Sequence, residues 1–232
     1  MKNFIYMNMS MIRKYKIFIE SFKSEMTPEI QKLINDTKKQ AEDNGVQIIL
    51  SQEKTVPYIV GDIQVSGYFV DYGNPRLAVA MGKPLKDWVM ILAHEGSHMD
   101  QWIEDSPYWT DNFINGRESV EYIDEWCAGK EFTEEEVDNF IKRSIGVELD
   151  CEKRTIEKAK KYNLPVNIKE EIQKANSYIL FYTFVKESRK WNTPGKAPYQ
   201  IREVWSKMPD TFEIDYTQIP EDIRELYRKY CY

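Results

Sequence analysis

The sequence is poor in the residues that hold small extracellular domains together. Its 232 residues include only three cysteines, Cys127, Cys151 and Cys231. Their odd number and unpaired spacing do not indicate a disulfide framework, and they favour a reducing compartment. Histidine is scarcer still, because His94 and His98 are the only two in the chain. A site that needs imidazole must use this pair.

Long apolar runs and a positive net charge are also missing. No stretch approaches the roughly 20 uninterrupted apolar residues of a membrane span. Arg13, Lys14 and Lys16 interrupt the apolar N-terminus, and no small-residue cleavage site follows, so no secretory signal is predicted. We therefore expect a cytoplasmic protein without a membrane partner. The net charge of −6 argues against a nucleic-acid partner.

What is present is the composition of an ordinary globular domain. Hydrophobic residues make up 42% of the chain, which is enough to bury a sizeable core, and 30% of the residues are charged. The sequence has no internal repeats and no low-complexity linkers. We therefore expect a single domain over residues 1–232.

The hydrophobic period changes along the first half of the chain. Thr27, Pro28 and Glu29 are typical of a helix start, and Asn44 and Gly45 of its end. Glycine and proline then punctuate short predicted strands at 46–50, 56–60, 63–70 and 76–81. The next predicted helix, 85–103, is apolar on opposite sides, as in a buried helix.

The second half of the chain is predicted to be mainly helical. Thr133 and Glu136 form a capping box at the start of a long helix that continues to about residue 163. Further helices are predicted at 168–190 and 220–230. A helix, a small and mostly antiparallel sheet, a buried helix and a helical half together predict the α+β class. We expect a sheet-containing lobe at about 25–104 and a helical lobe at about 105–232.

The buried helix carries both histidines, in the order His94, Glu95, Gly96, Ser97, His98. Residues four apart share one face of a helix, so the two imidazoles can bind one Zn²⁺. Glu95 lies about a quarter-turn away, where its carboxylate can take a proton from a metal-bound water. The spacing therefore predicts His94 and His98 as metal ligands and Glu95 as the catalytic base.

A catalytic zinc needs a third protein ligand, which here must be a carboxylate, a cysteine or a tyrosine. On the long helix, Glu148 falls at the middle of the apolar stripe, with Glu152 about 40° away. Asp150 falls on the opposite, solvent side. Because carboxylates that face a core need a positive partner, we predict that Glu148 ligates the metal. Glu152 would accept the N–H of a ligand imidazole.

Other residues remain open as the third ligand. Glu104 comes shortly after the second histidine, and Glu121 and Glu125 precede the long helix. Cys151 borders Glu148 on the helical wheel, and we interpret it as a small core residue rather than a ligand. In the alternative without a metal, the carboxylates of the stripe would pair with buried Arg, Lys or Tyr groups.

At these residues the chain resembles the zincin metallopeptidases of the gluzincin type. These proteins carry H-E-x-x-H on one helix and a glutamate ligand, often as E-x-x-x-D, on a later one. The matching positions are His94, Glu95, His98 and Glu148, with Glu152 in place of the usual aspartate. The resemblance covers residues 46–163 in outline. The segment 147–154 is also similar to uncharacterised proteins of large bacteriophages.

The resemblance implies a zincin-like fold and a zinc-dependent metallopeptidase that acts on peptide or protein substrates. The two histidines and Glu148 would bind zinc, and Glu95 would act as general base on a zinc-bound water. An extended substrate would add as a strand to a sheet edge beside the motif helix. Residues 76–81 are the strand that we expect to accept it.

The resemblance also implies an oxyanion stabiliser, which cannot be a third histidine here. Tyr178, Tyr182 and Arg189 fall along one face of the predicted helix 168–190 and are candidates, while an aromatic core stripe is the alternative interpretation of the tyrosines. The alternative function is a catalytically inactive, zinc-stabilised structural or binding protein. Such a protein has no need of Glu95, so this residue favours the enzyme.

Overall fold

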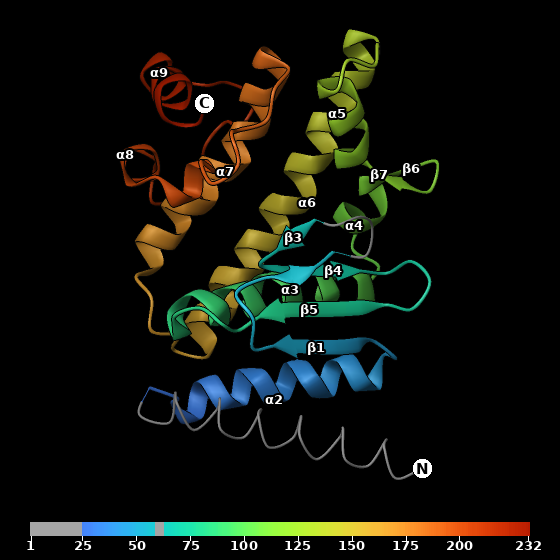
Figure 1. The fold of residues 1–232 in the computed structure, drawn as a ribbon, viewed down its shortest axis with the longest axis vertical. Helices are drawn as coiled ribbons and strands as arrows, with labels where there is room; N and C mark the ends of the chain where they lie inside the picture. The colour runs from blue at the N-terminus through green and yellow to red at the C-terminus, as the bar shows by residue number, and fades with distance from the viewer. Residues whose placement is uncertain (1–24, 59–62) are drawn as a thin grey trace. The chain divides into compact units, whose positions relative to one another are not determined.

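The computed structural model describes residues 25–58 and 63–232 (Figure 1). The chain divides into two compact units, unit 1 with Met1–Met99 and Lys161–Pro165, and unit 2 with Asp100–Lys160 and Val166–Tyr232. Two long helices contribute residues to both units, α3 (Leu85–Ile103) and α6 (Glu134–Lys161). Two sequence predictions, on the first 22 residues and on the end of the strand 56–60, concern segments outside the described residues.

The first helix of the described residues in unit 1 is α2 (Pro28–Asp43), whose start and end confirm the predicted capping residues. The backbone N–H of Ile30 donates to Thr27 Oγ1 at 3.3 Å, which satisfies one of the unpaired donors of the first turn. Gly45 follows the helix with a φ of 70°, a conformation that glycine adopts at little cost. The helix packs beside β1 (Gln47–Ser51), as Figure 1 shows.

A three-stranded sheet in the order β1, β5 (Arg76–Ala80), β4 (Gly67–Val70) lies in unit 1. β5 pairs with β4 antiparallel but with β1 in parallel. The prediction of mostly antiparallel pairing holds for β4–β5 and for the hairpin described below, and the β1–β5 pairing is the exception. The long connection between these two strands permits the parallel pairing. Part of this connection forms a separate antiparallel hairpin of β2 (Val56–Pro57) and β3 (Gln64–Val65).

β5 is the central strand and is hydrogen-bonded on both sides. Since a central strand offers no open edge, the expectation that residues 76–81 accept an extended peptide is wrong. The side chains of β5 are buried on both faces of the sheet, as is usual for a central strand. At most 1% of each residue is exposed in Leu77, Ala78 and Val79. Among the described residues, β1 and β4 form the two edges of this sheet.

The two faces of β4 have different neighbours. Tyr68 pairs with Ala78, and both lie in a small apolar cluster with Val56 of the hairpin. Gly67 pairs with Val79 on the other face, where α3 passes. Alternation along the strand thus separates an aromatic face from a face that contacts the motif helix.

Unit 2 is mainly helical, as predicted. Besides α6, its helices are α4 (Pro107–Asn112), α5 (Ser119–Cys127), α7 (Ile168–Ser188), η1 (Pro198–Gln200), α8 (Arg202–Trp205) and α9 (Glu221–Tyr230). The capping box of α6 is confirmed, because Thr133 N donates to Glu136 and Glu136 N donates back to Thr133 Oγ1. α7 ends two residues earlier than predicted, since Arg189 adopts a left-handed φ of 52°.

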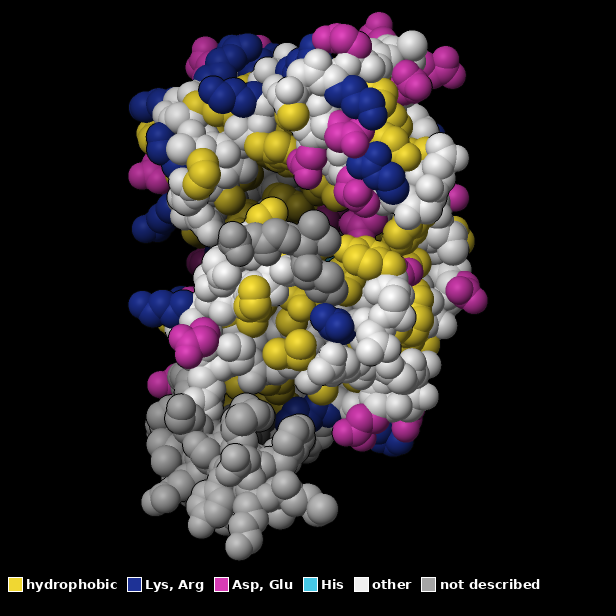
Figure 2. Space-filling model, turned by 45° about the vertical axis from the view of Figure 1, so that its right-hand side comes forward, with side chains coloured by type: hydrophobic (Ala, Val, Ile, Leu, Met, Phe, Trp, Pro, Cys, Tyr) yellow, Lys and Arg dark blue, Asp and Glu magenta, His cyan; other side chains and the backbone are white. Residues whose placement is uncertain are grey.

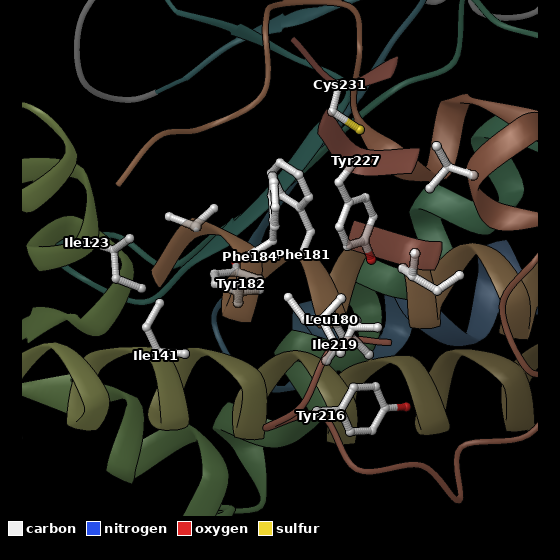
Figure 3. Close-up of a cluster of buried hydrophobic side chains, with 14 of the residues drawn as sticks. Ile123, Ile141, Leu180, Phe181, Tyr182, Phe184, Tyr216, Ile219, Tyr227 and Cys231 are labelled. Atoms are coloured by element: carbon white, nitrogen blue, oxygen red, sulfur yellow. The ribbon is translucent and has the colours of Figure 1, made fainter. Parts of the chain in front are cut away.

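The core of unit 2 is built around α7 (Figure 3). Ile179, Phe181 and Val185 of this helix are at most 1% exposed. Polar groups of α7 also hold the segment that precedes α9, because Asn176 Nδ2 donates to the carbonyls of Pro209 and Thr211, each at 2.8 Å. The C-terminal segment therefore belongs to the folded core of unit 2.

One hairpin of unit 2 was not predicted. β6 (Phe113–Ile114) and β7 (Arg117–Glu118) pair antiparallel around Asn115 and Gly116, which have φ values of 52° and 78°. Asn-Gly between two short strands favours this turn, so the sequence did contain the relevant pattern.

The fold as a whole confirms the predicted α+β class. The three cysteines are thiols and not disulfides, as their number and spacing indicate. Among the helices of the described residues, none is long and apolar enough to cross a membrane.

Candidate metal centre on helix α3

Helix α3 places the two histidines on one face, as the spacing predicts. The imidazole rings of His94 and His98 are both partly buried, with centroids 4.9 Å apart and ring planes at 89°. The opposite side of the helix is formed by fully buried Trp88, Val89 and Leu92. Because apolar packing fixes this side, the histidine face is held in one orientation.

The side chain of Glu95 projects from α3 toward β4. Its side chain belongs to the buried polar groups of the chain, with 9% exposure. β4 passes so close to the helix at this point that Gly67 is the only residue that fits. A Cβ at position 67 would lie 2.6 Å from Ile91 Cγ2 and 3.0 Å from Glu95 Cγ. The carboxylate that follows His94 is therefore positioned directly beside a sheet edge.

Gln101 joins the end of α3 to α6 within unit 2. It lies one turn after His98 and is fully buried. Its side-chain N–H group donates to the carbonyl of Val147 at 3.0 Å and to the Asp150 carboxylate at 2.8 Å. A buried amide with two such bonds fixes which residues of α6 face the last turn of α3. Sequence reasoning did not assign this role to Gln101.

Asp150 corrects one prediction. The sequence places Asp150 on the solvent side of α6, but its side chain is only 19% exposed. Its carboxylate also forms an ion pair with Arg154 at 2.7 Å. The longest apolar stripe of α6 indicates only one of the faces that this helix buries. A second neighbour, the end of α3, covers another face of this long helix and encloses Asp150 there. Polar contacts of this kind leave no hydrophobic pattern in the sequence.

A second buried contact joins the same two helices. Lys158 of α6 forms an ion pair with Asp100 of α3 at 2.8 Å, with side-chain exposures of 17% and 14%. Burial lowers the pKa of Lys158, although the charge of Asp100 acts in the opposite direction. Sequence reasoning missed this pair, since nothing along the chain relates positions 58 residues apart.

Glu148 lies near two tyrosines of α7. Burial is the first cause that raises the pKa of Tyr178 and Tyr182 well above the usual range, and the negative charge of Glu148 is the second. The two phenol oxygens are 2.9 Å apart and share a hydrogen bond. Glu152, one turn along α6, raises the pKa of Tyr216 in addition to the effect of burial. Both carboxylates therefore face α7 and the segment after it, as the apolar stripe predicts.

The candidates for oxyanion stabilisation differ in their surroundings. Tyr182 belongs to the buried core of unit 2 and Tyr178 packs against it, which agrees with the interpretation as an aromatic core stripe. Arg189 closes the C-terminal end of α7 and donates to the carbonyls of Trp126 and Lys130, each at 2.9 Å. These bonds give Arg189 a structural role at the helix end.

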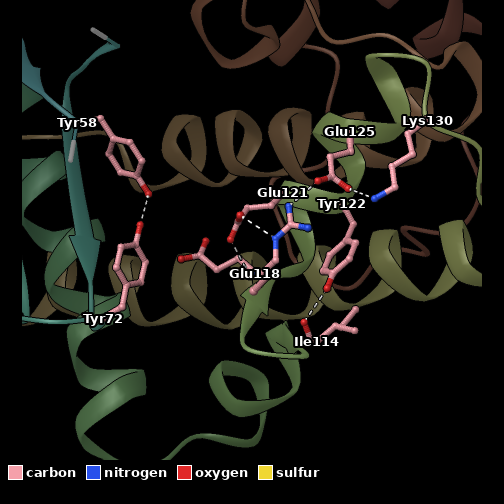
Figure 4. Close-up of polar contacts among 9 residues, drawn as sticks. Tyr58, Tyr72, Ile114, Glu118, Glu121, Tyr122, Glu125 and Lys130 are labelled. Carbon is pink, nitrogen blue, oxygen red and sulfur yellow. Dashed lines mark hydrogen bonds and ion pairs between the residues drawn. The ribbon is translucent and has the colours of Figure 1, made fainter. Parts of the chain in front are cut away.

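The rival carboxylates are ion-paired to basic side chains. Glu104 binds Arg154 at 2.7 Å and is 57% exposed. Glu121 and Glu125 both bind Arg117, as Figure 4 shows. Glu121 also accepts a bond from the backbone at the start of α5. These contacts explain the three carboxylates without a metal.

Comparison with known proteins returned no match, because no family model fits the chain and no curated protein or solved structure is significantly similar to it. The assignment of a function therefore depends on the residues of the site.

Proposed function

We propose that the chain is a zinc-dependent metallopeptidase with His94, His98 and Glu148 as metal ligands and Glu95 as general base. The arrangement on α3 supports this most directly. Two imidazoles share one helix face with ring centroids 4.9 Å apart, and a carboxylate with 9% exposure follows the first of them. Two histidines and one carboxylate are a donor set of hydrolytic zinc sites, which leave one position for water.

The chemistry divides between the metal and Glu95. Zinc would supply a Lewis acid that polarises the scissile carbonyl and makes water a nucleophile near neutral pH. Glu95 would accept the proton of the attacking water and pass it to the leaving amine. β4 would bind the extended substrate at its outer edge, because Gly67 of this strand lies against the Glu95 side chain.

Gln101 supports a third ligand from α6. Its side chain binds Val147 and Asp150, the residues that immediately precede Glu148 and Cys151. Glu148 is our proposed ligand. Cys151 is the alternative, because its thiol forms with His94 and His98 a group that could hold a metal ion. A cysteine would bind zinc as the thiolate.

Zinc content identifies the third ligand. Glu148→Gln should lower zinc binding by at least about 100-fold, since a catalytic site then retains two ligands. Cys151→Ser should leave zinc content unchanged. Glu157→Gln is a matched control, because this glutamate is an exposed residue of the same helix. Loss of zinc in Cys151→Ser together with full zinc in Glu148→Gln would transfer the ligand role to Cys151.

Peptidase activity tests the function itself. Purified wild type and Glu95→Gln should each contain one zinc, and only wild type should digest casein or a peptide library. Removal of a general base costs about 10²- to 10⁴-fold in rate. Equal digestion by the variant would remove Glu95 from the mechanism, and zinc-free preparations of both proteins would overturn the proposal.

A closed, structural zinc site is the second candidate, and Cys151 is the observation that favours it. This fully buried residue lies three positions after Glu148 on α6. If both bound the metal together with the two histidines, four protein ligands would leave no position for water. The protein would then contain zinc, lose stability on chelation and digest no substrate.

A further inference from the structure

Tyrosines of unit 1 lie along the face of β4 that points away from α3. The ring of Tyr58, which follows β2, packs edge-on against Tyr68 of β4, with centroids 5.3 Å apart and ring planes at 88°. The Tyr58 hydroxyl reaches further along the chain to Tyr72, with 3.2 Å between the two oxygens (Figure 4). Tyr58 therefore contacts both β4 itself and the residues just after it.

This group is unusually exposed for large side chains. Tyr72 is 44% exposed and Ile63 is 59% exposed, and these are the two exposed large hydrophobic residues among the described part of unit 1. Both lie next to Tyr58. The Tyr58 N–H donates to the Ile63 carbonyl at 2.9 Å, and the Tyr58 and Tyr72 hydroxyls share a hydrogen bond. Figure 2 shows that hydrophobic side chains reach the molecular surface in several places, between charged ones. Exposed apolar side chains that lie together are typical of a binding surface.

The hydrogen bond between the two hydroxyls restricts the rings of Tyr58 and Tyr72 before any partner binds. Tyr58 is also held by Tyr68, whose side chain is 8% exposed and fixed in the small apolar cluster. A ring that is already immobilised loses little conformational entropy when a partner packs on it. Tyrosine also offers a large apolar area with only two side-chain torsions to restrict. The Tyr58–Tyr72 pair is thus held in place while the Tyr72 ring stays 44% exposed.

We infer that Tyr58, Tyr72 and Ile63 form a substrate-binding surface that selects a peptide with an aromatic or large aliphatic side chain. The inference rests on the proposed peptidase function. A peptide strand paired with β4 alternates its side chains between two faces. Those on the α3 face approach Glu95, and those on the other face meet the three residues. Because two aromatic rings and an isoleucine form this surface, it favours an apolar side chain over a charged one.

The strand spacing places the selected side chain. Tyr68 and Tyr72 lie one and five residues beyond Gly67, the residue against Glu95. Because β4 ends at Val70, the rise of about 3.4 Å per residue applies to its first three steps, roughly 3–10 Å beyond Gly67. The selected residue should therefore be separated from the scissile bond by about one to three residues.

Two peptide series test the surface, one with Phe and one with Ser scanned through these positions. Wild type should cleave the best Phe peptide with kcat/KM at least about tenfold above its Ser partner, the effect of one aromatic contact. Tyr58→Ala and Tyr72→Ala should reduce this ratio to within about twofold. Zinc content should not change, because neither tyrosine is a proposed metal ligand. Tyr199→Ala is the matched control, because Tyr199 is 41% exposed but belongs to unit 2.

The outcomes separate the surface from the activity. Equal cleavage of both series by wild type would contradict the proposed binding surface but not the proposed peptidase function. The same holds if the two tyrosine variants keep the preference for Phe. Fluorescence anisotropy with Glu95→Gln measures peptide binding without turnover. Tighter binding of Phe than Ser peptides, without cleavage by wild type, would retain the surface and overturn the peptidase. Absence of both binding and cleavage would overturn both. Tyr72→Ala is informative even if Tyr58→Ala unfolds, since Tyr72 is the more exposed ring.

Discussion

At position 67, one additional carbon atom, the Cβ of any other residue, would change the geometry beside Glu95. A Cβ there would approach Ala78 O and Glu95 Cγ to 3.0 Å and Ile91 Cγ2 to 2.6 Å. Contacts this short require a shift of the strand, of the helix or of the Ile91 side chain. Glycine is needed here for close approach of two elements, not for its backbone freedom.

Gly67→Ala should therefore lower both stability and activity. Overpacking of a tight contact costs about 1–3 kcal/mol, which denaturant melts can measure. If Glu95 moves, kcat should fall more than KM rises. Gly146→Ala is the control, since its new Cβ would meet only Tyr108 at 3.5 Å. That change removes a glycine from the interior of α6 and should stabilise by about 0.5–1 kcal/mol. A Gly67→Ala protein with wild-type stability would contradict the close approach.

At the scale of elements, the end of α3 contacts α6 within unit 2, and the proposed site depends on this contact. Two buried polar contacts make it, the amide of Gln101 and the Asp100–Lys158 ion pair. Hydrogen bonds of this kind have strict geometry, so they allow one register between the helices. Slippage by one residue along α6 would rotate Glu148 by about 100° away from its position.

Replacement of Gln101 should lower both the stability of the fold and the affinity for zinc. Gln101→Leu leaves the Val147 carbonyl and the Asp150 carboxylate without this donor, at a cost of about 1–3 kcal/mol. Zinc affinity should fall by about 10–100-fold, the usual effect of disturbing the residues that orient a ligand. Gln173→Leu is the matched control. It removes a 2.8 Å bond to the Met208 carbonyl elsewhere in unit 2 and should leave zinc affinity unchanged. Equal zinc affinity in both variants would contradict the positioning role.

At the scale of the whole molecule, the proposed metal would link folding to zinc. The proposed ligands lie on α3 and α6, the two helices that contribute residues to both compact units. A ligand that binds only the folded chain stabilises it in proportion to the logarithm of its concentration. Metal binding should therefore be visible as thermal stability, independently of any activity.

Addition of zinc to chelator-treated protein should raise the Tm. At 100 times Kd the stabilisation is about 2.7 kcal/mol, which corresponds to roughly 5–11 °C for a chain of this size. Glu95→Gln should show the same shift, whereas His98→Ala should show none. Differential scanning calorimetry with zinc and with magnesium separates the specific effect from a general effect of divalent cations. A Tm that does not respond to zinc would contradict the metal centre.

Several features of the whole molecule could be predicted because they depend on local chemistry. Thr27 and Thr133 begin helices because their side chains satisfy backbone donors a few residues away. The β1–β5 pairing and the central position of β5 could not be predicted in the same way. Strand order depends on contacts between distant segments, and apolar residues that can form a central strand can also form an edge strand.

The sequence by itself determined that His94, Glu95 and His98 lie together on one buried helix, since residues four apart share a face in any α-helix. It also determined that Glu148 lies on the face of α6 toward α7, through the period of its apolar neighbours. Only the tertiary structure decided that Gly67 presses on Glu95, that Gln101 binds α6 and that Tyr58 lies along β4. These contacts join residues far apart in the chain, and close packing in three dimensions selects them.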